Sequence, residues 1–230
     1  MHTPYVDSPP RPPEHRPATR ATVALALCSV LLLVLVAAEW HPLISADDDI
    51  ADTTHRWAVD EPGLTHAFRI LSDWVWDPWT MRVLCGIAVI WLVWRRNARW
   101  TAVWLVATCA LGTLLQQALK AAVGRERPVW PDPVDSAHFA AYPSGHALTA
   151  TVVCGLLLWL LHRYDSGRAL WRTALTLTVV SVVGVGLTRI WLGVHWPSDV
   201  LGGWLLGAML VTLAVTVHQR WGPRTTSHDG

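Results

Sequence analysis

An arginine, a histidine and an aspartate near the C-terminus have spacings suited to phosphate chemistry. Arg189, His195 and Asp199 form the pattern Arg-x5-His-x3-Asp. A carboxylate four residues after a histidine lies one helical turn away, so it can hold one imidazole nitrogen and leave the other free as nucleophile or base. A histidine–aspartate pair alone is often structural. Arg189 adds a cation to the same region, which favours chemistry on an anion.

Two more cations precede this pattern in the arrangement Lys-x6-Arg-Pro, which comprises Lys120 and Arg127. Lys120 is the only lysine of the chain. Alone, Lys120 is compatible with an anchor that extends from a helix end toward water, and Arg127 with a solvated loop charge. Together, a point charge and a planar guanidinium suit different oxygens of one phosphate.

A tetrapeptide between these patterns, Pro143-Ser144-Gly145-His146, directly precedes an apolar run. Ser144 can cap the helix, and a helix start with Gly145 offers free backbone N–H groups to an anion. His146 then lies beside that anion. An ordinary cap followed by an interfacial histidine explains the tetrapeptide equally well.

The acidic residues do not form a cluster suited to two divalent metals. Asp132 and Asp135 have the spacing of a solvated loop, and we expect the run Asp47, Asp48 and Asp49 to be solvated as well. We therefore expect neither a metal nor a cofactor. Lysine, arginine and N–H groups would manage the phosphoryl charge, which favours catalysis through a phosphohistidine.

These residues lie at the ends of long apolar segments. The 230-residue chain is 52% hydrophobic and only 15% charged, too apolar for an ordinary soluble domain. Six apolar runs predict six membrane-spanning helices, in residues 21–38, 79–94, 100–119, 147–161, 173–187 and 200–217. We expect an all-α bundle of one domain over residues 21–219, between a disordered cytoplasmic tail of residues 1–20 and a cytoplasmic tail of residues 220–230.

The first loop, roughly residues 40–78, contains a further helix signal. Asp60, Glu61 and Pro62 are typical of a helix start. Apolar residues then recur at helical spacing, namely Leu64, Phe68, Leu71 and Val75. This pattern predicts a short amphipathic helix on the outer leaflet. A helix packed over the bundle fits the pattern equally well.

Arginine placement predicts the orientation of the helices. Clusters at residues 95–99 and 163–172 fall on the side that both termini share, whereas the other side carries the acidic first loop. We expect a multi-pass protein of the cell membrane with cytoplasmic termini and all three motifs on the extracytoplasmic face. The net charge of +1 argues against a nucleic-acid partner.

The three motifs resemble those of the type-2 phosphatidic acid phosphatases, also called lipid phosphate phosphatases. The family pattern is Lys-x6-Arg-Pro, then Pro-Ser-Gly-His, then Ser-Arg-x5-His-x3-Asp. This chain matches the pattern except for Thr188 in place of the serine, which keeps the hydroxyl. Motif order and the six-helix organisation also agree, so the resemblance covers roughly residues 20–220.

The resemblance implies a role for each motif residue. His195 would be the nucleophile, Asp199 its orienting partner, and His146 the group that protonates the leaving oxygen and later activates water. The phosphoryl oxygens would be bound by Lys120, Arg127, Ser144, Gly145 and Arg189. The implied substrates are lipid phosphates or diphosphates in the bilayer, such as phosphatidate, phosphatidylglycerol phosphate or a polyprenyl diphosphate.

Two other functions remain compatible with the sequence. A phosphotransferase would use the same intermediate with an acceptor other than water, and a transport or scaffold protein could carry a vestigial site. The complete set of motif residues argues against the vestigial site. Soluble haloperoxidases share the constellation, but the six apolar runs disfavour that class. The sequence leaves the exact substrate and the oligomeric state open.

Overall fold

The structure is a computed structural model that describes residues 16–221. These residues form eight α-helices and one short π-helix, without strands. Six segments are long and apolar enough to cross a membrane, as the sequence predicts. In chain order the elements are α1 (Arg16–Ala37), α2 (His41–Asp60), α3 (Pro62–Ile70), η1 (Leu71–Val75), α4 (Pro78–Arg96), α5 (Arg99–Val123), α6 (Gly145–Arg163), α7 (Arg168–Trp191) and α8 (Pro197–Trp221).

The first and last helices extend beyond the expected domain boundaries. α1 begins at Arg16, so residues 16–20, which we expected to belong to the tail, are helical. α8 continues to Trp221. The remainder of the two expected tails, residues 1–15 and 222–230, lies outside the described residues.

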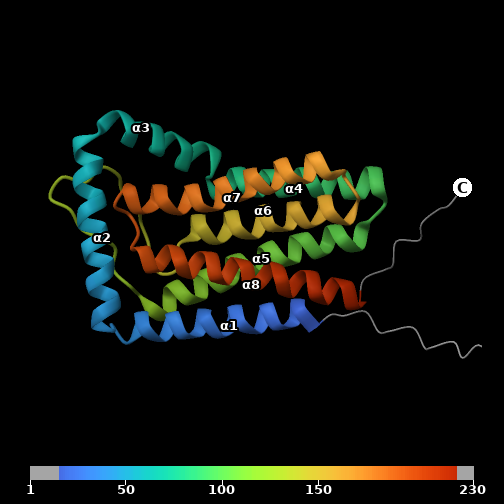
Figure 1. The fold of residues 1–230 in the computed structure, drawn as a ribbon, viewed down its shortest axis with the longest axis horizontal. Helices are drawn as coiled ribbons and strands as arrows, with labels where there is room; N and C mark the ends of the chain where they lie inside the picture. The colour runs from blue at the N-terminus through green and yellow to red at the C-terminus, as the bar shows by residue number, and fades with distance from the viewer. Residues whose placement is uncertain (1–15, 222–230) are drawn as a thin grey trace, which may run out of the picture.

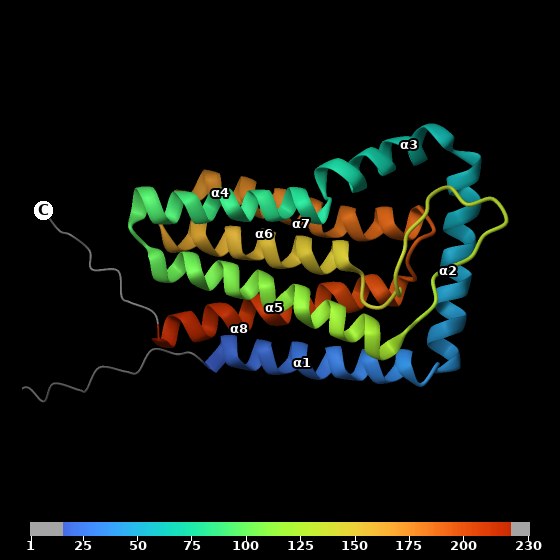
Figure 2. The ribbon, with the colours of Figure 1, turned by 180° about the vertical axis from the view of Figure 1, so that it is seen from behind.

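The membrane-crossing helices run along a common direction (Figures 1 and 2). The start of α1 and the end of α8 lie at one end of this bundle. The other end, which we call the motif end, contains the end of α5, the start of α6, the end of α7 and the start of α8. The topology therefore brings all three sequence motifs to one end of the bundle.

Close packing between α6 and α8 forms the centre of the bundle, and these two spans have the largest buried share. A Cβ atom on Gly203 would lie 2.7 Å from the carbonyl oxygen of Ser144, and one on Gly207 would lie 2.7 Å from Cβ of Thr151. Small residues at such positions let two helix backbones approach each other. Gly203 thereby holds α8 against the turn that carries Ser144 and His146.

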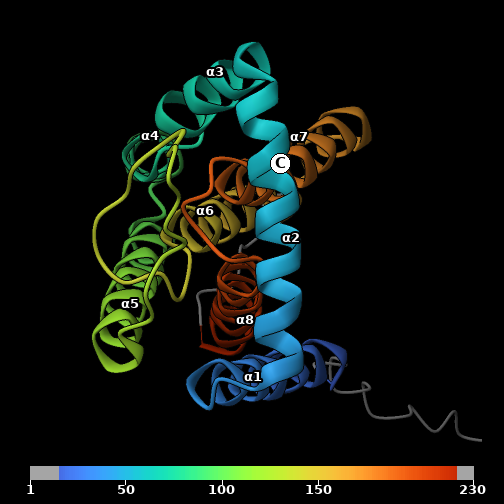
Figure 3. The same ribbon diagram turned by 90° about the vertical axis from the view of Figure 1, so that its left-hand side faces the viewer.

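Helix α2 lies across the motif end, roughly perpendicular to the bundle (Figures 1 and 3). No sequence pattern predicted this helix, and the expectation that Asp47 is solvated is wrong. Asp47 is 2% exposed and binds Arg125 and Ser198, whereas the neighbouring Asp48 and Asp49 are exposed. Asp47, Asp48 and Asp49 lie in one turn of an amphipathic helix, and Asp47 is the one that faces the bundle.

The predicted amphipathic helix is present as α3 and η1, and α3 begins at Pro62 as expected. Together with α4 it forms one of the six candidate membrane-crossing segments, Pro62–Arg96. Asp77 caps α4, because its carboxylate accepts from the Trp79 N–H at 2.7 Å. α3 packs on α7, because the Trp191 indole donates to the Thr65 hydroxyl at 2.9 Å. Packing over the bundle thus describes this helix better than a position on the lipid surface alone.

The close approach at Gly203 predicts a stability effect. Gly203→Ala would place its methyl group against backbone atoms of residues 144 and 148, which cannot move independently of α6. We expect a loss of about 1–3 kcal/mol in the free energy of unfolding, measured by thermal unfolding in detergent. Gly86→Ala on α4 is the matched control, because a Cβ there meets nothing within 4 Å. Equal melting temperatures for the two variants would contradict the account of the α6–α8 packing.

Candidate active site

The turn between α7 and α8 positions His195. Gly193 has a φ of +66°, a conformation that glycine adopts without strain, and its carbonyl accepts from the Trp130 indole at 2.9 Å. α8 then begins at Pro197, so Asp199 lies in its first turn. The predicted contact is present, since His195 Nδ1 lies 3.3 Å from Asp199 Oδ2.

The partners of His195 define its tautomer. Arg127 Nη1 lies 3.2 Å from His195 Nε2. A guanidinium can only donate and a carboxylate can only accept, so Nδ1 carries the proton and Nε2 carries the lone pair. The nitrogen next to the arginine is therefore the one whose lone pair is free to react.

Each motif cation is held by backbone or hydroxyl oxygens. Lys120, in the last turn of α5, donates to the carbonyl oxygens of Ala140 and Ala141. Arg127 donates to carbonyl oxygens of the same loop and of the α7–α8 turn, namely those of His138, Phe139 and Val194. Arg189, in the last turn of α7, donates to the Ser72 hydroxyl at 2.8 Å. These oxygens are uncharged and do not neutralise the cations, although Arg189 also lies 3.8 Å from the carboxylate of Asp135.

The motif side chains converge on one region. His146 and His195 both interact electrostatically with the same three cations, Lys120, Arg127 and Arg189. The five groups come from α5, the loop that follows it, α6, α7 and the turn before α8. The structure thus gathers two imidazoles within one strongly positive centre.

Two buried donors at this centre have no hydrogen-bond partner in the described part of the chain. α6 begins at Gly145 with Ser144 as its N-cap residue, as predicted, but the Ser144 hydroxyl makes no capping bond and is buried without a partner. Arg189 Nε is likewise buried and unpaired. An unsatisfied buried donor costs about 1–3 kcal/mol, so the pair fits a site completed by an anion.

The electrostatic environment keeps His195 neutral. Burial lowers its pKa well below the ordinary value, and the nearby charges of Arg127, Arg189 and Lys120 lower it further. Burial, followed by the charge of Arg189, also lowers the pKa of Arg127 to about 10. Arg127 still carries its charge at neutral pH, beside an unprotonated imidazole. Residues 16–221 contain no group of three His, Cys, Asp or Glu side chains placed to hold a metal ion.

Sequence reasoning missed two residues next to this centre. Arg125 donates to Asp199 Oδ1 and to Asp47 Oδ2, at 2.7 Å in both cases. Arg125 lies two residues before Arg127, yet no spacing rule indicated its partners. The buried residues of α2, Asp47, Ala51 and His55, recur every four residues, and this helical spacing could have predicted the helix.

The expectation of a solvated loop also fails for Asp135. Its side chain is 16% exposed and lies 3.8 Å from Arg189 Nη1. Asp132 is 62% exposed, as expected, although its carboxylate contacts His55 at 3.1 Å. Asp135 faces inward because the loop after α5 folds over the end of α7, where Arg189 lies.

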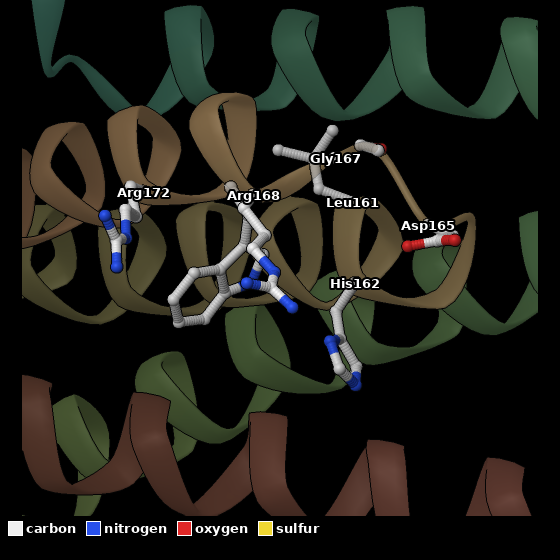
Figure 4. A pocket seen from close by; sticks show the side chains of 8 residues that line it. Leu161, His162, Asp165, Gly167, Arg168 and Arg172 are labelled. Atoms are coloured by element: carbon white, nitrogen blue, oxygen red, sulfur yellow. The ribbon is translucent and has the colours of Figure 1, made fainter.

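A cavity of about 380 Å³ lies away from the motifs, where α6 joins α7 (Figure 4). Its lining includes His162, Asp165, Arg168 and Arg172 but no motif residue. Both arginines are exposed. This cavity therefore lacks the buried, convergent groups that distinguish the motif end.

Comparisons with known proteins show which proteins this chain is similar to. A family model described as the PAP2 superfamily matches residues 101–223. The undecaprenyl-diphosphatase of Sulfolobus acidocaldarius is 29% identical over 154 residues, 63% of this chain and 64% of that protein. The decaprenylphosphoryl-5-phosphoribose phosphatase of Mycobacterium tuberculosis is 36% identical over 166 residues, 69% of this chain and 83% of that protein.

A solved structure shares the fold. It is a transmembrane PAP2-type phosphatidylglycerolphosphate phosphatase from Bacillus subtilis, which superposes with a TM-score of 0.79 at 23% identity. The match covers 90% of this chain and 99% of the solved one. The overall fold of this chain is therefore one that a transmembrane phosphatase of the PAP2 type adopts.

The depressed pKa of His195 predicts a titration. In ¹⁵N NMR of the imidazole-labelled protein, with His195→Ala for assignment, we expect Nε2 to stay unprotonated as the pH falls through about 6.5, the ordinary histidine pKa. Adding inorganic phosphate should raise the pKa of His195, because the anion offsets the charges of Lys120, Arg127 and Arg189. A protonated Nε2 near neutral pH without phosphate would contradict this electrostatic description.

Proposed function

The chain belongs to the PAP2 superfamily, and we propose that it is an integral membrane phosphatase that hydrolyses lipid phosphates or diphosphates through a phosphohistidine. The observation that carries the proposal is the neutral, Asp199-bound His195, whose free nitrogen lies among three cations. The buried unpaired donors of Ser144 and Arg189 support it, because a phosphoryl group would satisfy them.

The first step forms the covalent intermediate. His195 Nε2 donates its lone pair to phosphorus, and the bond from phosphorus to the leaving oxygen breaks. The bound phosphoryl group offsets the charges of Lys120, Arg127 and Arg189, so His146 is protonated in the complex. His146 gives this proton to the leaving oxygen, and the lipid departs as a neutral alcohol or a phosphate. Asp199 stabilises the positive charge that His195 gains.

The cations and the α6 start stabilise the charge on the phosphoryl oxygens. Lys120, Arg127 and Arg189 supply the positive charge, while Ser144 and the backbone N–H of Gly145 supply hydrogen bonds. Arg127 exchanges its contact with Nε2 for a phosphoryl oxygen as the substrate binds. A positioned acid and preorganised donors each contribute roughly a hundredfold or more in rate.

The second step regenerates the enzyme. His146, now neutral, takes a proton from water as the water oxygen attacks phosphorus, and the bond between nitrogen and phosphorus breaks. Inorganic phosphate leaves and His195 returns to its neutral form. No step requires a metal or a cofactor.

An amphiphilic substrate suits the position of this centre. The motif residues lie at the ends of membrane-crossing helices, so a phosphate can enter while its apolar chain stays in the lipid. The relatives are named for polyprenyl diphosphate, decaprenylphosphoryl-phosphoribose and phosphatidylglycerolphosphate substrates. We place the substrate in this class of lipid phosphates.

The charge distribution supports an extracytoplasmic active site. Arg95, Arg96 and Arg99 lie where α4 joins α5, and Arg168 and Arg172 lie on the same end of the bundle, opposite the motifs. Because arginine-rich ends face the cytoplasm, both termini would be cytoplasmic and the motif end would face outward.

The proposal predicts turnover by the purified full-length protein in detergent or liposomes. We expect phosphate release from at least one of phosphatidate, phosphatidylglycerol phosphate and undecaprenyl diphosphate, undiminished by a chelator of divalent cations. His195→Ala should abolish release, whereas His66→Ala, which alters an exposed histidine on α3, should not.

Each arm of this assay has a contrary result. Loss of activity with the chelator would contradict the metal-independent mechanism. Retained turnover in His195→Ala would remove His195 as nucleophile. Transfer of phosphate to an added alcohol in place of release to water would identify a phosphotransferase.

A further inference from the structure

Arg125 lies between two buried carboxylates and binds both. Its Nη1 donates to Asp199 Oδ1 and its Nη2 to Asp47 Oδ2, each at 2.7 Å. The side chains of Asp47 and Asp199 are 2% and 0% exposed, and that of Arg125 is 12% exposed. Charge-assisted hydrogen bonds in such surroundings are short and strong, and an uncompensated charge there is costly.

Asp47 also holds the first turn of α8. Its Oδ1 accepts from the Ser198 N–H at 2.9 Å, and its Oδ2 accepts from the Ser198 hydroxyl. Ser198 directly precedes Asp199, and Arg125 Nη1 donates to the Ser198 hydroxyl at 2.7 Å as well. Helix α2 is therefore connected to the residue that orients His195.

The charges along this chain of contacts alternate. Asp199 is negative, Arg125 positive and Asp47 negative, so the three groups together carry one negative charge next to His195. Without Asp47, the charge of Arg125 would cancel that of Asp199. His195 gains positive charge when it attacks phosphorus, and the net negative charge behind it favours that step.

We propose that Asp47 and Arg125 are positioning residues for His195, which act through Asp199 by fixing its carboxylate and balancing its charge. The inference rests on the proposed function, and neither residue is a fixed position of the three motifs, since Arg125 occupies one of the unspecified positions between Lys120 and Arg127. It assigns the acidic turn of α2, outside the six spans, a part in the chemical step.

A purely structural clamp between α2 and α8 is the competing explanation, and charge balance distinguishes the two. A clamp weakens with every contact removed, so the double variant Asp47→Asn/Arg125→Gln would be worse than Asp47→Asn alone. In a charge-balanced network the double variant restores the single negative charge of Asp199, so its activity recovers relative to Asp47→Asn.

The first experiment measures kcat and KM of Asp47→Asn against Asp48→Asn, an exposed neighbour on α2. We expect Asp47→Asn to lower kcat by about tenfold to a hundredfold, the range found when the hydrogen-bonded partner that orients a metal-bound histidine is removed. Its KM should change by less than about twofold, because the contacts to the phosphate remain. Asp48→Asn should match the wild type.

The second experiment adds the double variant, with melting temperatures for all variants. A kcat above that of Asp47→Asn supports the proposal, and a kcat equal to or below it overturns the proposal. An unchanged kcat in Asp47→Asn also overturns it. If Asp47→Asn fails to fold, Arg125→Lys takes its place, because a lysine ammonium cannot bind both carboxylates as the planar guanidinium does. In that case a kcat of Arg125→Lys equal to the wild-type kcat overturns the proposal.

The assay separates the two proposals. If the wild-type protein itself releases no phosphate from any lipid phosphate, the proposed function fails, whatever the variants do. If the wild type and Asp48→Asn are active and Asp47→Asn is equally active, only the positioning role fails.

Discussion

The buried carboxylate of Asp199 is the contact on which the motif end depends. Its Oδ2 meets His195 Nδ1 and the Trp196 N–H, and its Oδ1 meets Arg125. Its backbone carbonyl accepts from the Ser144 N–H at 2.9 Å, so the same residue also anchors the start of α6. One aspartate thus joins His195, the turn at Ser144 and, through Arg125, the helix that lies across the bundle end.

The membrane imposes the rest of the arrangement. Polar groups cannot be satisfied by lipid, so the chemistry is confined to the end of the bundle, where loops and α2 supply partners. The glycines of α8 let it approach α6 closely, which brings Asp199 within reach of Ser144. Positive charge then accumulates at one place. Lys120 and Arg127 are held there by carbonyl oxygens, and Arg189 by the Ser72 hydroxyl and, at 3.8 Å, by the carboxylate of Asp135.

The sequence predicts what depends on neighbouring residues and misses what depends on distant ones. The spans follow from apolar runs, and the His195–Asp199 contact follows from a four-residue spacing within one turn. The ion pair between Asp47 and Arg125 joins residues far apart in the chain, so no local pattern indicates it. α2 was missed because its mean polarity suggested a solvated loop, although its inward face repeats at helical spacing. The Ser144 hydroxyl was expected to cap α6 but stays unpaired, since the turn holds it inside the site.

The central claim is that His195, oriented by Asp199, forms a bond to phosphorus. The most direct measurement is a rapid quench of turnover with a radiolabelled lipid phosphate, followed by digestion at alkaline pH and mass spectrometry of the phosphorylated peptide. The account predicts an acid-labile phosphate on His195 that forms and decays at rates matching turnover. A phosphate on another residue, or turnover at full rate with no labelled peptide, would contradict it.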